Sequence, residues 1–304
     1  GGETVTVTAN GGESADVDLD SNITNVSFVV TVDNAADDFE TGNGADVVNL
    51  GAVTATGTIA TGAGDDELDL AAGVAANISG ATVTGFTDLD LAAGATLTMT
   101  ETQAALFDME GVDGSEVVTI APNAGESADV DLNTGINNVS FVVTVDHAAD
   151  DFETGNGDDV VNLGAVTATG TIATGAGDDE LDLAAGVTAS ISGATVSGIT
   201  DVDLAAGAAL TVTEAQAAAF DMEGIDGSEV VTVAANAGAT DIDLTDGNTN
   251  VSFVVTIDNA GDDFETGGGY DVVNILDGIT ATGTIDTGGG TDEIDLADGV
   301  TASI

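Results

Sequence analysis

A long and nearly exact repeat limits what this chain can fold into. The segment Asn-Val-Ser-Phe-Val-Val begins at Asn25, Asn138 and Asn250, so its copies recur at a spacing of about 113 residues. Extending each copy outward predicts three units, at residues 1–113, 114–226 and 227–304, the last of them incomplete. Repetition of this length is typical of a solenoid or a string of domains. An enzyme is less expected, because it seldom needs the same surface three times.

A finer period of nine residues runs inside each unit. In the first unit, residues 32–40, 41–49, 61–69 and 70–78 each combine a turn rich in Gly or Ala with a short strand. Each strand carries one large apolar residue that we expect to point inward, namely Phe39, Val48, Leu68 and Ile78. Two such steps would make one coil of about 18–20 residues, as in parallel β-helices.

The predicted fold class is therefore all-β, with parallel β-roll or β-solenoid segments in tandem units of about 113 residues. We expect one short helix in each unit. Thr100 with Gln103 and Thr213 with Gln216 match the capping box, and alanines follow both pairs. The helices should pack against the roll and bury Phe107 or Phe220.

The turns contain the residues from which a metal site could be built. Six of them read Thr-Gly-x-Gly-x-Asp and begin at Thr41, Thr61, Thr154, Thr174, Thr266 and Thr287. Calcium takes six to eight oxygen ligands, and a Gly-x-Gly turn is free to adopt positive φ and direct its carbonyls at one point. One turn supplies about half of such a shell, so we expect the turn one coil away to supply the rest. Thr41 and Thr61 are separated by the length of one predicted coil, so we expect their turns to stack.

The turn pattern resembles the RTX nonapeptide Gly-Gly-x-Gly-x-Asp-x-apolar-x of calcium-binding parallel β-rolls, as found in bacterial surface-layer and other secreted repeat proteins. Thr in place of the first Gly departs from that family's pattern. The resemblance implies bound Ca²⁺ with these ligands: Asp46, Asp66, Asp159, Asp179, Asp271, Asp292, Asn43, Asn156, Gly42, Gly44, Gly62, Gly64, Gly155, Gly157, Gly175, Gly177, Gly267, Gly269, Gly288 and Gly290. Three less similar turns would add Asp37, Asp150 and Asp262.

The charge of the chain also calls for external cations. There are 55 Asp and Glu residues and no Lys or Arg, which gives a formal net charge of −55. If about 15 coils rise about 4.8 Å each, the charges lie about 1.3 Å apart along the axis, closer than the about 1.7 Å of duplex DNA. Such a rod should resist folding until cations neutralise it, so we expect folding to be coupled to calcium.

Composition excludes several classes of partner. Without Lys or Arg, binding to nucleic acids or to anionic membrane surfaces is not expected. No apolar run is long enough to insert into a bilayer. Cysteine is absent, so neither disulfides nor thiolate metal sites are available. A single histidine, His147, has no catalytic partner in the sequence, and we expect no enzyme activity.

These observations lead to one functional expectation and two alternatives. We expect an extracellular structural protein, secreted by a bacterium to its surface, that binds calcium in its turns and assembles with copies of itself into a surface layer or filament. The first alternative is the spacer of a giant calcium-dependent adhesin, whose tandem domains are often β-sandwiches. The second is the calcium-binding secretion tail of a secreted enzyme. Because the pattern is interrupted at Ile304, we expect the chain to be a segment of a longer protein.

Overall fold

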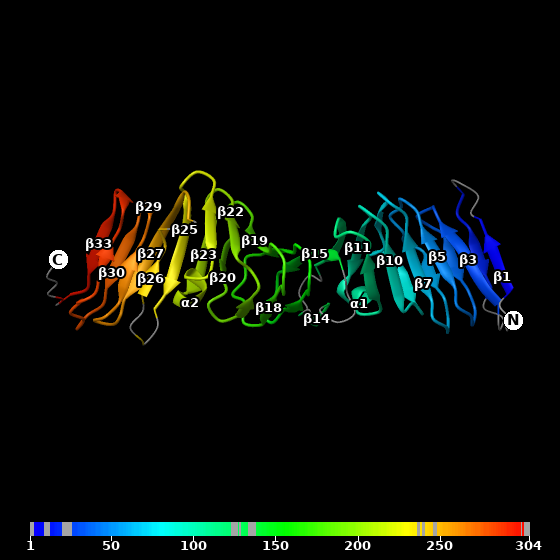
Figure 1. Ribbon diagram of the computed structural model, residues 1–304, viewed down its shortest axis with the longest axis horizontal. Coiled ribbons are helices and arrows are strands. Elements are labelled where there is room, and N and C mark those ends of the chain that lie inside the picture. The colour runs from blue at the N-terminus through cyan, green and yellow to red at the C-terminus, as the bar shows by residue number, and fades with distance from the viewer. Residues whose placement is uncertain are drawn as a thin grey trace.

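A computed structural model describes residues 3–8, 13–19, 26–122, 127, 129–132, 138–235, 238, 241–245, 248–298 and 300. The chain forms an elongated β-solenoid with its two termini at opposite ends (Figure 1). All of the paired strands among the described residues run parallel, and only two very short helices accompany them. The predicted fold class is confirmed. A β-sandwich, which the adhesin alternative would suggest, is excluded by this strand arrangement.

Three main sheets follow one another along the solenoid. The first contains β1 (Glu3–Val7), β3 (Val26–Val32), β5 (Val47–Leu50), β7 (Glu67–Leu70), β10 (Asp88–Leu91) and β12 (Asp108–Gly111). The second contains β8 (Ala75–Asn77), β11 (Thr96–Thr100), β13 (Glu116–Ala121), β15 (Val139–Val145), β17 (Val160–Leu163), β19 (Glu180–Leu183), β22 (Asp201–Leu204) and β24 (Asp221–Gly224). The third contains β20 (Thr188–Ser190), β23 (Ala209–Thr213), β25 (Glu229–Ala234), β27 (Val251–Ile257), β30 (Val272–Ile275) and β33 (Glu293–Leu296).

Smaller sheets form other sides of the coils. One contains β2 (Asp16–Asp18), β4 (Asp38–Glu40), β6 (Thr58–Ala60) and β9 (Thr82–Thr84), and its counterpart contains β14 (Asp129–Asp131), β16 (Asp151–Glu153), β18 (Thr171–Ala173) and β21 (Thr195–Ser197). The last two contain β26 (Asp241–Asp243), β28 (Asp263–Glu265) and β31 (Ile285–Asp286), and β29 (Gly268–Gly269) with β32 (Gly289–Gly290).

The coils vary in length more than the nine-residue period suggests. Val29 pairs with Val47, whereas Thr58 pairs with Thr82, so the step from one coil to the next is clearly longer in the second of these pairs. The solenoid consequently makes about 13 turns instead of the expected 15. A shorter rod carries the same charge at a still higher linear density, which strengthens the need for external cations.

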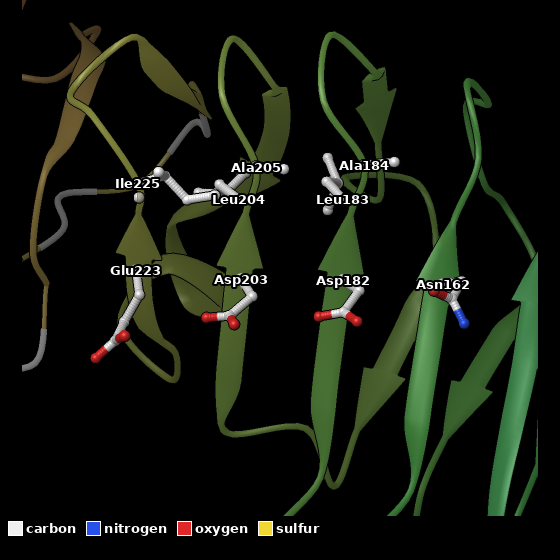
Figure 2. Close-up of a pocket in the computed structure, with 10 residues that line it drawn as sticks. Asn162, Asp182, Leu183, Ala184, Asp203, Leu204, Ala205, Glu223 and Ile225 are labelled. Carbon is white, nitrogen blue, oxygen red and sulfur yellow. The ribbon is translucent and has the colours of Figure 1, made fainter.

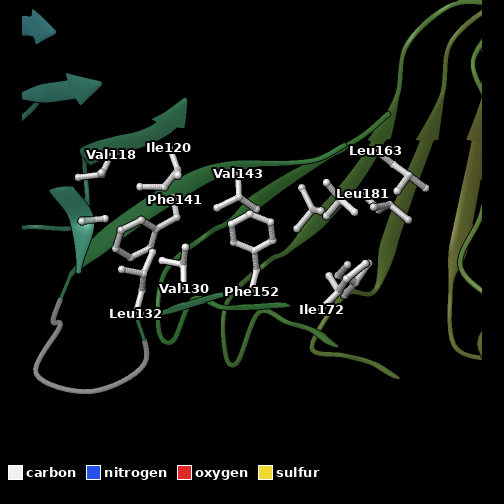
Figure 3. Packing of buried hydrophobic residues seen from close by; sticks show 14 of the residues in the cluster. Val118, Ile120, Val130, Leu132, Phe141, Val143, Phe152, Leu163, Ile172 and Leu181 are labelled. Atoms are coloured by element: carbon white, nitrogen blue, oxygen red, sulfur yellow. The ribbon is translucent and has the colours of Figure 1, made fainter. Parts of the chain in front are cut away.

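The core is a stack of identical inward positions. Val48, Leu68 and Leu89 are directly paired on neighbouring strands, and each is at most 1% exposed. The four residues predicted to point inward are all buried, as expected. The three phenylalanines Phe28, Phe141 and Phe253 are buried as well. Figure 3 shows this interior in the second unit, where Phe141 and Phe152 lie among aliphatic side chains. One continuous cluster of buried residues runs through all three units, so they share a single core.

The two helices are α1 (Glu101–Ala104) and α2 (Glu214–Ala217), each a single turn. Both predicted capping boxes are present. The Thr100 hydroxyl accepts a hydrogen bond from the Gln103 N–H at 3.2 Å, and Gln103 Oε1 accepts one from the Thr100 N–H at 2.8 Å. Each helix ends early because the following phenylalanine turns into the core, and the ring of Phe107 lies 5.8 Å from that of Phe86.

The solenoid changes its main sheet at each unit junction, which the repeat did not predict. β10 and β12 belong to the first main sheet, whereas β8 and β11, on another side of the same coils, begin the second. A short turn connects Gly111 at the end of β12 to Glu116 at the start of β13. β13 then pairs with β11 and joins the second main sheet, and it does not extend the first main sheet beside β12. The same change occurs between β24 and β25. Equivalent surfaces of successive units therefore face different directions.

Candidate metal centres

The predicted calcium turns of the first unit stack directly on each other. Asn43 forms a parallel bridge with Ala63, and the Gly44 N–H donates to the Ala63 carbonyl at 3.0 Å. A Cβ atom on Gly64 would lie 1.5 Å from the Gly44 carbonyl oxygen, so only glycine permits this approach. Gly62, at φ +84°, would meet the Gly42 carbonyl in the same way. Gly44, whose added Cβ would lie 2.2 Å from the Val26 carbonyl oxygen, is constrained likewise, so backbone packing requires glycine at Gly44, Gly62 and Gly64.

The two aspartates of these turns point into the interior. Asp46 and Asp66 are at most 1% exposed. Asp46 Oδ1 accepts a hydrogen bond from the Phe28 N–H at 2.8 Å, and Asp66 Oδ1 accepts one from the Asp46 N–H at 2.8 Å. The second oxygen of each carboxylate, Oδ2, is buried and has no hydrogen-bond partner among the described residues. A buried carboxylate oxygen without a partner is costly unless a cation or a proton neutralises it.

The second and third units repeat this arrangement with small differences. Asp159 Oδ1 accepts from the Phe141 N–H at 2.7 Å, and Asp179 Oδ1 accepts from the Asp159 N–H at 2.9 Å. Asp271 Oδ1 accepts from the Phe253 N–H at 2.8 Å. In the described part of the chain, Oδ2 of Asp179 and Oδ2 of Asp271 also lack a partner, whereas Asp159 Oδ2 accepts the Thr154 hydroxyl at 2.5 Å. Asp292, in the last described coil, is only half-buried.

Burial dominates the electrostatics of these turns. It raises the pKa of Asp66, although the Asp46 N–H and the Thr61 hydroxyl both act to lower that pKa. The Thr61 hydroxyl lies near the carboxylate but does not meet the geometry of a hydrogen bond to it. Burial also raises the pKa of Asp179 and of Asp271, and it raises the pKa of Asp159 to about 6. The three threonines Thr61, Thr174 and Thr266, which depart from the family pattern, present buried hydroxyls to these carboxylates.

The three less similar turns have a different geometry. Asp37 Oδ1 accepts from the Ala15 N–H at 2.8 Å, and its Oδ2 accepts from the Asp33 and Asn34 N–H groups at 3.1 and 2.9 Å. Oδ2 of Asp150 and Oδ2 of Asp262 each accept two equivalent backbone bonds. Backbone donors occupy these carboxylates, so the geometry favours turn stabilisation over metal binding at these positions.

A second acidic arrangement, not predicted from the sequence, lies on the outer face of the main sheets. Ligand oxygens of Glu67, Asp69 and Asp90 all lie within 4.8 Å of one another, and so do those of the counterparts Glu180, Asp182 and Asp203. Asp69 is paired with Asp90 on the neighbouring strand, so carboxylates from two successive coils lie side by side. These two acidic triads could each hold a metal ion. The alternation Glu-Leu-Asp-Leu at residues 67–70 and Asp-Leu-Asp-Leu at 88–91 is the sequence signal for them.

A shallow groove runs beside each triad. In the second unit Asp182, Asp203 and Glu223 line up on neighbouring strands below an apolar strip (Figure 2). Its volume is about 330 Å³, and the equivalent groove of the first unit has about 380 Å³. The groove of the second unit is lined by Asn162, Asp182, Leu183, Ala184, Asp203, Leu204, Ala205, Glu223, Gly224 and Ile225.

Burial, together with neighbouring carboxyls, raises pKa values on this face as well. Burial, with a hydrogen bond to the Glu67 carboxyl, raises the pKa of Asp90 to about 6. Burial and hydrogen bonds to Asp182 and Asp203 raise the pKa of Glu180 to about 7. At neutral pH and without metal, such groups retain part of their protons.

These shifts predict that the metal-free protein is more stable in mild acid. Because the pKa values of Asp90, Asp159 and Glu180 are raised on folding, their contribution is fully present below about pH 4 and is lost as pH rises through about 6 to 7. We expect the Tm in chelator with 1 M NaCl, which screens the charge so that the metal-free chain stays folded, to be higher near pH 5 than near pH 8 by about 5 °C or more. Thermal melts followed by circular dichroism would test this, and a Tm that is flat or rises with pH would contradict it. In excess calcium the trend should weaken or reverse, since protons compete with the metal.

Comparison of the chain with family models, curated proteins and solved structures yields no match. The resemblance to RTX repeats therefore rests on the residues of the turns alone. No helix in the described part of the chain has the length and apolar character needed to cross a membrane. The fold and the acidic sites define a β-solenoid protein with candidate cation sites in its interior turns and on its outer face.

Proposed function

We propose that this chain is a calcium-binding structural protein. Its turns hold Ca²⁺ between stacked coils, with Asp46 and Asp66 in the first unit, Asp159 and Asp179 in the second, and Asp271 and Asp292 in the third. The observation that carries the proposal is a set of buried Oδ2 atoms, those of Asp46, Asp66, Asp179 and Asp271, that have no hydrogen-bond partner among the described residues. The chain has no Lys or Arg to neutralise them.

The ligand chemistry favours calcium over softer metals. The sites offer carboxylate oxygens and, from the glycine turns, carbonyl oxygens, and the chain contains no cysteine and one histidine. Oxygen-only sites suit Mg²⁺, Ca²⁺ and Mn²⁺, and irregular turns of backbone and side-chain oxygens suit the flexible coordination of Ca²⁺ best. The outer triads would add further sites, whose occupation would reduce repulsion between neighbouring strands.

We further propose that the protein acts outside a bacterial cell, where copies assemble into a surface layer or filament. Near-identical units present equal contact surfaces, which favours regular assembly. The spacer of a calcium-dependent adhesin is a second candidate, favoured by the elongated shape of the solenoid (Figure 1).

Electron microscopy of the purified protein with millimolar CaCl₂, and again with chelator, tests the proposal. We expect ordered sheets or filaments in calcium that disappear in chelator. Isolated stiff rods in calcium would favour the adhesin spacer while retaining the metal sites. Images that do not change on chelation would contradict calcium binding as the basis of the structure.

A further inference from the structure

The outer surface of the main sheets is divided sharply into a charged part and an uncharged part. On β7, β10 and β12 the outward positions are all acidic, namely Glu67, Asp69, Asp88, Asp90, Asp108 and Glu110. By contrast, the outward positions of β8, β11, β13, β15 and β17 contain only Ala, Asn, Ser, Thr and Val. We name this second region the junction face, because it spans the change from one unit to the next.

The register of the strands makes the junction face continuous. Its central row runs Thr98, Thr119, Val142, Val160 across four paired strands, and all four side chains are half-exposed. The next residue in the row is Glu180, where the acidic part begins. The only acid within the five strands, Glu116, is fully buried and accepts a hydrogen bond from the Gly114 N–H at 2.9 Å.

The third main sheet carries an equivalent junction face on β20, β23, β25, β27 and β30. Its central row is Thr211, Thr232, Val254, Val272, followed by Glu293. The acid of these strands, Glu229, is again buried. The same separation of charged from uncharged surface thus occurs twice over five strands. The three strands β1, β3 and β5 repeat part of it, with Thr6, Val29 and Val47 in the corresponding row before Glu67.

From this separation we infer that the junction faces are the surfaces through which copies of this chain contact each other. The inference rests on the self-assembly in the proposed function and names the surface responsible. Every acidic surface repels its counterpart on a second copy, because the chain has no cationic side chain to pair with it. Only an uncharged face allows contact without that repulsion, and half-exposed Thr and Val on a sheet pack well against a second sheet about 10 Å away. A cationic partner would instead select the acidic surfaces.

The size of a junction face indicates how it would act. Five strands about 4.8 Å apart and about five residues long cover roughly 400 Å², so two paired faces bury about 800 Å² in total. Stable pairs usually bury about 1,200–2,000 Å², so one contact alone is weak. The two junction faces lie on different sheets that form different sides of the solenoid, so each copy would meet different neighbours. Several weak contacts per chain then combine into an array instead of a closed dimer.

A pair of charge substitutions tests this surface. Thr119→Asp with Thr232→Asp places one carboxylate at the centre of each junction face. Thr82→Asp with Thr195→Asp is the matched control, since these exposed threonines lie on β9 and β21, in the first and second units and away from the junction faces. Association of the full chain would be measured by sedimentation velocity, first in millimolar CaCl₂ and then in chelator with 1 M NaCl. Circular dichroism and calcium titration would report folding and metal binding.

We expect the wild type to associate in at least one of the two conditions. The junction-face variant should need at least tenfold higher protein concentration than the wild type to associate to the same extent. The concentration that the control needs should stay within about twofold of the wild-type value. If the Asp variant does not fold, Thr119→Gln with Thr232→Gln replaces it, with an expected shift of at least threefold. Equal association of wild type and junction-face variant, or a monomeric wild type in both conditions, would overturn the inference. If the protein associates in 1 M NaCl through the junction face but binds no calcium, the inference about this surface holds and the proposed calcium function is rejected.

Discussion

Removing calcium at low ionic strength is expected to unfold most of the β-structure of this chain. The chain carries 55 acidic residues on a solenoid of about 13 turns, and it has no Lys or Arg to offset them. It also buries carboxylate oxygens that have no hydrogen-bond partner among the described residues. The unfolded chain relieves both penalties, because its charges separate and every carboxylate is hydrated.

The size of the effect follows from ligand binding to the folded state. A site held at about 100 times its Kd contributes about 2.7 kcal/mol, so two occupied turn sites would add about 5 kcal/mol, comparable with the whole stability of many domains. Far-UV circular dichroism during titration of chelated protein with CaCl₂ would measure this. Restoration of the β-signal by millimolar Ca²⁺, but not by the same ionic strength of NaCl, is the expected result. A spectrum unchanged by chelator would contradict the coupling of folding to metal.

The second large effect is expected from Asp66→Asn combined with Asp179→Asn. The amide oxygen of the new side chain can still accept the backbone N–H of Asp46 or Asp159, now 2.8 and 2.9 Å from Oδ1. The amide carries no charge, and its NH₂ group can donate to the hydroxyl of Thr61 or Thr174, both buried without a described partner. We therefore expect the double variant to melt about 5 °C higher than the wild type in chelator with 1 M NaCl, where screening keeps the metal-free chain folded.

In calcium the order should reverse. The variant loses one ligand from the turn site of each of two units, and the stabilisation by calcium should fall by about 5 kcal/mol. Asp65→Asn with Asp178→Asn is the control, because these neighbouring aspartates are exposed and the change of net charge is the same. Thermal melts of the three proteins with and without calcium separate the site from the general charge. A variant that keeps the full calcium response would show that the buried aspartates do not bind the metal.

Much of the fold could be predicted from local sequence patterns. The nine-residue period identified the inward positions Phe39, Val48, Leu68 and Ile78, since a solenoid core repeats the same side-chain position in every coil. The capping boxes at Thr100 and Thr213 were visible because their partners lie three residues away. Both features depend only on residues that lie close together along the chain, so the sequence alone is enough to predict them.

The candidate site was only partly accessible in this way. The stacking of the Gly-x-Gly turns follows from their spacing of one coil, but the direction of Asp66 into the interior and its bond to the Asp46 N–H depend on how the coils are packed. The outer triads were missed because Asp69 and Asp90 become neighbours only through strand pairing. The three less similar turns show the opposite case, in which the sequence pattern predicted ligands that the structure does not favour. At Asp37, backbone N–H groups donate to both of the carboxylate oxygens that the turn pattern alone would offer to a metal.

By itself, the sequence determined a parallel, repetitive β-structure that must obtain its counter-charges from outside, because periodicity and composition are properties of the chain. Only the tertiary structure decided which side of the solenoid each unit occupies. The change of main sheet between Gly111 and Glu116 depends on whether β13 pairs with β11, in the second sheet, or with β12, in the first. Both pairings satisfy the same alternation of inward and outward residues. That pairing separates the acidic surfaces from the junction faces, and it does so because strand neighbours are set by how the coils close in space and not by their spacing along the chain.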